Sequence, residues 1–213
     1  MRPLSAIVLV GGRGRRMGGN KALLDVEGKP LVGWVLERLA EISDDVMIVA
    51  RDAAPFEHLA ARVVTDIYPD EGPLVGLHAG LRGARHPSAL AVACDMPFLD
   101  LRLVRYMIVV GKAHDAVVPL IRGLPEPLHA MYRVDRCLPA VEKALDAGCL
   151  KMTGFLSSVQ VRYVQEHEVD LFDPAHLSFF NVNTPDDLRR GREMARQIGR
   201  QQTERSLSTE AEE

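Results

Sequence analysis

A loop rich in glycine and arginine follows the first apolar segment of the chain and holds the densest cluster of residues suited to chemistry. Positions 11 to 20 contain five glycines and three arginines, and Lys21 follows directly. Glycine lets backbone N–H groups approach a ligand closely, and the cations can neutralise phosphate oxygens. Because crowded cations repel one another unless an anion binds, the pattern indicates a phosphate-binding loop. The preceding run Ala6–Val10 predicts a buried strand, and open α/β sheets bind nucleotides at such strand ends.

The two common phosphate-binding motifs do not fit this region. A P-loop requires Ser or Thr after Gly-Lys, whereas Lys29 is followed by Pro30. The dinucleotide fingerprint would begin at Gly12, but its third glycine position holds Met17. The loop therefore predicts a nucleotide site of a different kind.

A second candidate is Asp95, which follows the apolar run at 90–93 after one residue, Cys94. A carboxylate at the end of a buried strand is costly unless something binds it. Mg²⁺ is a suitable partner, because this hard cation takes carboxylate and phosphate oxygens. The alternative is that Asp95 caps the following turn, although Asp100 is better placed to cap the next helix. Cys94 reads as a small buried residue, not a nucleophile.

Two further segments carry polar or small residues at strand ends. Asp66 ends an expected strand, where it could accept hydrogen bonds from a ribose or a base, or serve as an ordinary turn residue. Gly76 and Gly80 lie four residues apart on an expected helix, so they permit close approach either of a ligand or of a packed strand. Asn181 and Asn183 project from one face of an extended segment, and their amides suit a pterin edge or a phosphate.

Composition narrows the classes of protein. The 213 residues are 47% apolar and 26% charged, which suits a globular protein, and the net charge of −3 disfavours a polynucleotide or acidic-membrane partner. The three cysteines cannot all pair and show no C-x-x-C spacing, so we expect a reducing compartment and no structural zinc. Neither a signal segment nor a membrane-spanning run is evident, and a cytoplasmic protein is expected.

Apolar, β-branched runs alternate with segments of helical periodicity. This alternation predicts an α/β fold with a mostly parallel central sheet and helices on both faces. Residues 122–132 interrupt the pattern and predict a small hairpin excursion over the binding face. A last helix should begin at Thr184 and end near Arg200. We expect one domain over residues 1–200 and a disordered tail over 201–213. The predicted strands are Ala6–Val10, Val46–Ala50, Arg62–Thr65, Ala89–Ala93, Ala116–Leu120, Leu128–Tyr132 and Val159–Gln165.

Together these segments resemble the molybdenum-cofactor guanylyltransferases, over about residues 6 to 188. The resemblance lies in L-x-G-G-x-x-x-R-M-G-x-x-K from Leu9, G-P-L-x-G-x-x-x-G-L from Gly72, C-D-M-P-F from Cys94, P-L-H-A-x-Y from Pro127 and N-x-N-T-P-x-D-L from Asn181. It implies a Rossmann-like nucleotidyltransferase fold. The nucleotide site would lie mainly in residues 6–100 and the acceptor side mainly in 101–190.

The resemblance also implies roles for individual residues. Leu9, Gly11 and Gly12 would face the guanine nucleotide, and Arg16 and Lys21 its phosphates. Asp66 would help to hold the nucleoside, Asp95 would bind Mg²⁺, and Asn181 and Asn183 would face the pterin. Arg16, Lys21 and Asp95 would be the catalytic set.

Two local choices bear on the base. Related cytidylyltransferases resemble L-A-A-G in the first loop, and the second glycine in Leu9-Val10-Gly11-Gly12 leaves more room for a purine. By contrast, the family often has an asparagine after the second strand, where this chain has Ala50-Arg51-Asp52. That nucleotide contact is lost or replaced here.

The implied reaction transfers GMP from GTP to the molybdopterin cofactor and releases pyrophosphate. Alternatives left open are a related enzyme that uses CTP or another phosphorylated acceptor, and a non-catalytic GTP-binding module. Transient contact with cofactor-synthesis proteins or molybdoenzyme chaperones is also left open.

Overall fold

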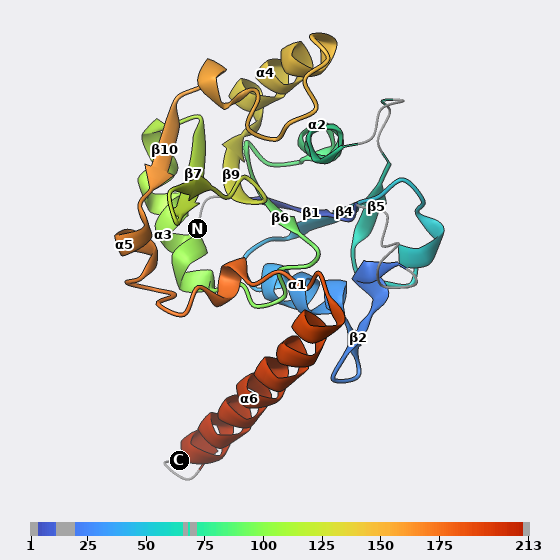
Figure 1. Cartoon of the computed structure of the whole chain (residues 1–213), viewed down its shortest axis with the longest axis vertical. Coiled ribbons are helices and arrows are strands. Elements are labelled where there is room, and N and C mark those ends of the chain that lie inside the picture. Colours follow the sequence, from blue (N-terminus) through green and yellow to red (C-terminus); the bar gives the residue numbers. More distant parts are fainter. Residues whose placement is uncertain (1–3, 12–19, 66–67, 69–71, 211–213) are drawn as a thin grey trace.

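The computed structural model describes residues 4–11, 20–65, 68 and 72–210, and for 201–210 it describes the backbone alone. Its main sheet has the strand order β10-β7-β9-β6-β1-β4-β5 (Figure 1). The bounds are β1 Ser5–Leu9, β4 Asp45–Val49, β5 Arg62–Val64, β6 Ser88–Ala93, β7 Ala116–Ile121, β9 His129–Arg133 and β10 Val161–Val164. Pairing is parallel except around β9, which runs antiparallel to both β6 and β7.

Helices cover both faces of this sheet. Helices α1 (Leu31–Ala40) and α3 (Leu101–Val110) pack on one face, and α2 (Pro73–Gly83) and α4 (Val134–Asp146) pack on the other (Figure 1). Along β1, the side chains of Ala6 and Val8 join the first core, and those of Ile7 and Leu9 join the second. A strand buried on both faces must be apolar throughout, which explains its continuous apolar sequence. The predicted fold class is confirmed.

Residues 122–132, which interrupt the alternation of strands and helices, form a hairpin strand and then part of a central strand of the sheet. Strand β8 (Leu124–Pro125) pairs with the end of β7 through a two-residue turn in which Arg122 and Gly123 both have positive φ, 52° and 75°. The chain then enters the centre of the sheet as β9, between β6 and β7. The hairpin prediction is confirmed, and its second half proves to be a core strand.

The fold also contains a small hairpin and several short helices. Strands β2 (Asp25–Val26) and β3 (Lys29–Pro30) form a hairpin, which the sequence analysis missed because each strand is only two residues long. Short helices are η1 (Lys21–Leu23), η2 (Ala54–Phe56), η3 (Gly111–Ala113), η4 (Leu156–Ser158), α5 (Glu166–Val169) and η5 (Leu177–Phe179).

The last helix, α6 (Pro185–Glu210), begins as predicted but is longer than expected. The Asp187 N–H donates to the Thr184 hydroxyl at 3.1 Å, which caps the start. The backbone of 201–210 continues the helix past Arg200, contrary to the predicted end, because no glycine or proline in that stretch breaks it. Figure 1 shows its second half projecting from the body. In the described part of the chain, α6 is too polar to cross a bilayer, and no other helix is long and apolar enough.

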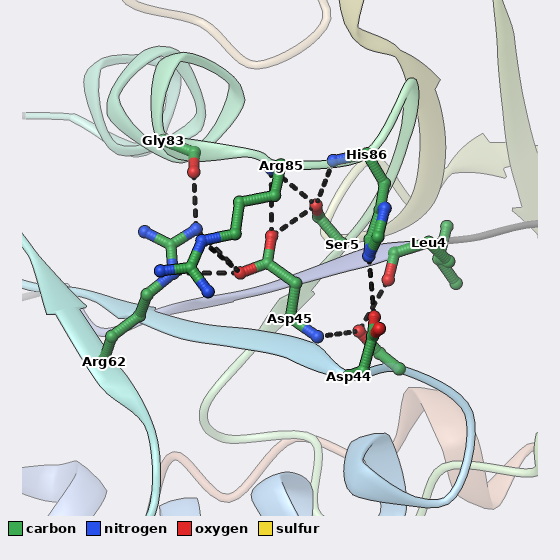
Figure 2. A network of polar contacts seen from close by, with 9 residues as sticks. Leu4, Ser5, Asp44, Asp45, Arg62, Gly83, Arg85 and His86 are labelled. Atoms are coloured by element: carbon green, nitrogen blue, oxygen red, sulfur yellow. Dashed lines mark hydrogen bonds and ion pairs between the residues drawn. The ribbon is translucent and has the colours of Figure 1, made fainter.

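At the amino ends of β1 and β4, a buried carboxylate ties several segments together (Figure 2). Asp45 is 2% exposed and accepts hydrogen bonds from the Ser5 hydroxyl at 2.6 Å, the Arg85 N–H at 3.0 Å and the Arg62 guanidinium at 2.9 Å. Burial raises the pKa of Asp45, but these donors outweigh it and leave the pKa below its ordinary value of 3.8.

We expect Asp45→Asn to lower the free energy of unfolding by about 3 kcal/mol at pH 7, because it leaves buried donors and a guanidinium without their counter-charge. The pKa of Asp45 is lower in the folded protein than in the unfolded chain, so the ionised carboxylate stabilises the fold at pH values above its unfolded pKa. This contribution to the free energy of unfolding is lost progressively as the pH falls below about 4. Urea titrations at pH 7 and pH 3 should therefore show the two proteins converging in acid. Asp44→Asn, at a neighbouring carboxylate that is 83% exposed, is the control and should change little. Equal losses in the two variants at pH 7 would contradict the role of Asp45.

Candidate active site

A cleft of about 770 Å³ opens at the carboxyl ends of β1, β4 and β6. This is the edge where parallel α/β sheets bind ligands. Its lining comes from six segments of the chain: Leu9–Gly11, Asn20–Ala22, Val49–Asp52 with Pro55 and Phe56, Gly72, Pro73 and Gly76, Ala93–Asp95, and Leu128. The predicted nucleotide residues Leu9, Gly11, Lys21 and Asp95 all border it.

Lys21 and Asp95 form an ion pair at this cleft. The Lys21 ammonium lies 2.6 Å from the Asp95 carboxylate, and the two side chains are only 17% and 18% exposed. The same ammonium donates to the Asn183 side-chain oxygen at 2.6 Å. Residues from the first loop, the end of β6 and the segment before α6 therefore meet at one cation.

Local structure explains how Asp95 reaches this position. It follows β6 in a turn, and the adjacent Cys94 N–H donates to the Leu9 carbonyl at 3.1 Å. Asp100 caps α3 by accepting from the Arg102 N–H at 2.7 Å, so the capping role belongs to Asp100 as anticipated. The Asp95 carboxylate is left to face Lys21. Burial raises the pKa of the Cys94 thiol to about 12, which agrees with a buried and unreactive cysteine.

Helix α2 points its amino end at the cleft. Its first residue, Pro73, and the preceding Gly72 line the cleft, and among the described residues no side chain caps that end. The first backbone N–H groups of a helix lack intrahelical partners and carry partial positive charge, so this end favours an anion. The cleft thus combines a helix terminus with the Lys21 cation.

The two glycines of α2 have different surroundings. A Cβ at Gly80 would lie 2.5 Å from Ile7 Cγ2 in the core, so this glycine serves helix-to-strand packing. A Cβ at Gly76 would lie 3.0 Å from the Leu9 side chain, and Gly76 also borders the cleft. At Gly11, which also borders the cleft, a Cβ would meet no atom of the described residues within 4 Å.

Several predicted residues stand apart from this arrangement. Gly12, Arg16 and Asp66 lie outside the described residues. Asn181 donates its side-chain N–H to the Phe179 carbonyl at 3.1 Å, and so belongs to its own loop and not to the Lys21 cluster.

Sequence reasoning missed Pro55 and Phe56, which line the cleft beside Arg51 and Asp52. The only signal for them was the departure at Ala50-Arg51-Asp52, which marked this segment without identifying the aromatic ring.

A metal ion would find limited protein ligation here. The described residues contain no group of three or more His, Cys, Asp or Glu side chains suited to a metal. Mg²⁺ ordinarily takes one or two carboxylates and completes its shell with water and substrate phosphates. The Asp95 carboxylate at the cleft, with Asp52 as a second carboxylate in the lining, fits that pattern, whereas a zinc-type cage does not.

Comparison with known proteins agrees with this architecture. Residues 6–163 match the family model described as a MobA-like NTP transferase domain. A probable molybdenum cofactor guanylyltransferase of Pelotomaculum thermopropionicum is 39% identical over 92% of this chain and 95% of the relative. A molybdenum cofactor guanylyltransferase of Desulfosudis oleivorans is 35% identical over 94% and 99%.

Solved structures give the same picture. The molybdopterin-guanine dinucleotide biosynthesis protein A of Archaeoglobus fulgidus has a TM-score of 0.79 and 33% identity, covering 91% of this chain and 99% of that one. A 2-C-methyl-D-erythritol 4-phosphate cytidylyltransferase of Thermus thermophilus, 18% identical with a TM-score of 0.67 over 89% and 98%, shares the fold alone. The fold and the cleft thus define a nucleotidyltransferase. More narrowly, the chain belongs to the MobA-like NTP transferase family.

We expect Gly80→Ala to destabilise the protein by about 1–3 kcal/mol, because the added methyl overlaps Ile7 in a packed core. Gly199→Ala, in α6 where a Cβ meets nothing within 4 Å, is the matched control and should not destabilise. Thermal unfolding of both variants tests this. A stable Gly80→Ala protein would show that the close packing of α2 on β1 is not required.

Proposed function

We propose that this protein transfers GMP from GTP to the terminal phosphate of the molybdopterin cofactor, releasing pyrophosphate. The observation that carries the proposal is the pairing of Lys21 with Asp95 at the mouth of the cleft. The names of the relatives support the substrates, and the family supports the reaction class.

The proposed reaction mainly requires that the negative charges of the two substrates be neutralised. The acceptor is an anionic phosphate, so no strong general base is needed, but two polyanions must be brought together. Lys21 and the amino end of α2, both in the lining of the cleft, supply positive charge. Mg²⁺, held by Asp95, would neutralise the triphosphate and polarise its α-phosphate. The protein's task is to orient the α-phosphate for in-line attack by the acceptor oxygen.

The remaining residues divide between the two substrates. Leu9, Gly11 and Gly12 would contact the guanine nucleotide, Asp66 would hold the nucleoside, and Arg16 would join Lys21 at the phosphates. The open space at Gly11 supports close approach of a nucleotide to that backbone. Asn181 and Asn183 would face the pterin of the acceptor. We further propose that the protein acts in the cytoplasm, where its soluble substrates would be found. We also propose that it makes transient contact with cofactor-synthesis proteins or molybdoenzyme chaperones.

Calorimetric titration with GTP and with CTP, each with Mg²⁺, tests the choice of base. We expect GTP to bind at least about tenfold more tightly, because a pocket built to pair with a base rejects one that leaves its polar groups unpaired. Pyrophosphate release that requires molybdopterin then separates an enzyme from a GTP-binding module. A preference for CTP would overturn the guanylyl assignment.

We expect Asp95→Asn to reduce turnover by at least about a hundredfold, the size of effect seen for one electrostatic contributor in an active site. Pyrophosphate release at saturating GTP and Mg²⁺ measures this, with the melting temperature as a check on folding. Asp44→Asn, an exposed carboxylate at the opposite edge of the sheet, is the control for a general loss of charge. Near-normal turnover by a folded Asp95→Asn protein would rule out the metal-binding role.

A further inference from the structure

The Lys21 ammonium has two partners of different character. It lies 2.6 Å from a carboxylate oxygen of Asp95 and 2.6 Å from the amide oxygen of Asn183. The first partner carries a full negative charge, whereas the second is neutral. An ammonium has three N–H donors, so both contacts together still leave one for a further acceptor.

Asn183 is held firmly in place by its own segment. The neighbouring Val182 is fully buried, and its N–H donates to the Asp95 carbonyl at 3.0 Å. The Asn183 N–H donates to the Asp187 carboxylate at 3.1 Å, at the start of α6. The backbone beside Asn183 is thus tied directly to the backbone of Asp95, and the exposed Asn183 side chain extends from this anchored backbone to Lys21.

Anchoring continues upstream of Asn183. The ring of Phe180 stacks on that of Phe98 with centroids 6.2 Å apart. The buried Asp173 accepts from the N–H groups of Leu177 at 2.9 Å and Ser178 at 2.8 Å, and the Ser178 hydroxyl accepts from the Asp100 N–H at 2.8 Å. Segment 177–183 is therefore pinned along its length to the residues that follow β6.

The two partners of Lys21 respond differently to a metal ion. A divalent cation on Asp95 cancels the attraction of that carboxylate for Lys21 and repels the ammonium. A neutral amide oxygen can still hold the ammonium, and it does so without reducing the positive charge available to phosphate. An acidic residue at position 183 would instead neutralise Lys21 and repel the phosphates.

We propose that Asn183 is a positioning residue for Lys21, whose amide oxygen keeps the ammonium at the mouth of the cleft when Asp95 binds the metal of the incoming nucleotide. This rests on the proposed function. It assigns Asn183 an action on the nucleotide side through Lys21, in addition to the acceptor-side location expected from sequence.

A double-mutant cycle tests the assignment. The binding of tripolyphosphate with Mg²⁺ is measured by calorimetry in the unaltered chain, Asn183→Ala, Lys21→Met and the double variant. We expect Asn183→Ala to weaken binding about tenfold when Lys21 is present, the scale of one hydrogen bond to a charged group. In the Lys21→Met background it should change binding less than about twofold, because residues that act through one another are not additive.

Two further measurements separate positioning from a structural effect. The loss caused by Asn183→Ala should be larger with Mg²⁺ than with EDTA, because Asp95 alone holds Lys21 when no metal competes. Asp186→Asn removes an exposed carboxylate in the same segment, paired with Arg189, and should leave binding unchanged. Asn183→Asp keeps an oxygen acceptor but adds charge, and it should bind tripolyphosphate more weakly than the unaltered chain does.

Equal losses from Asn183→Ala with and without Lys21 would overturn the assignment, as would an effect seen only in molybdopterin affinity. Tripolyphosphate has no base, so the cycle is independent of the guanylyl proposal. Tighter binding of CTP than of GTP would overturn that proposal while the coupling between Lys21 and Asn183 could still be observed. Failure of tripolyphosphate to bind the unaltered chain with Mg²⁺ would overturn the positioning role.

Discussion

The ion pair between Lys21 and Asp95 is the contact on which the cleft depends. It joins residues 74 positions apart, and the hydrogen bond from the same ammonium to Asn183 spans 162 positions. A carboxylate with only 18% of its side chain exposed needs a partner, and so does a lysine as little exposed. Each charge thus stabilises the position of the other, and three distant segments converge at the edge where the sheet meets the cleft.

Because the sheet is buried on both faces, the register of its strands is fixed, and the ends of the strands at the cleft have fixed positions. Because β1 carries core side chains on both sides, it cannot shift register against β4 or β6 without exposing apolar surface. The carboxyl ends of β1 and β6, at Leu9 and Ala93, therefore lie side by side. The tight contact of Gly80 with Ile7 sets the distance of α2 from the sheet, and with it the place of the α2 amino end in the cleft.

Charged side chains have different surroundings at the amino ends and at the carboxyl ends of the parallel strands. At the amino ends, Asp45 has all its donors supplied by the chain, so that network serves stability (Figure 2). At the carboxyl ends, Lys21 and Asp95 border an open cleft and rely on one another and on a neutral amide. The cleft gives a ligand access to Lys21 and Asp95, whereas Asp45 is buried.

Sequence by itself determined the fold class, most strand positions and the cap at Thr184, because these follow from local periodicity and turn chemistry. Its short motifs also singled out Lys21 and Asp95, which the structure brings together at the cleft. The sequence could not find the two-residue strands β2 and β3, the core position of β9, or the extent of α6 past Arg200. Nor could the sequence show that Gly80 packs against the core whereas Gly76 borders the cleft. It also could not show that the Asn183 side chain binds Lys21 whereas the Asn181 side chain binds within its own loop. Only the tertiary structure decided these features, because each depends on which distant segment of the chain packs against the residue. The local sequence does not specify that segment.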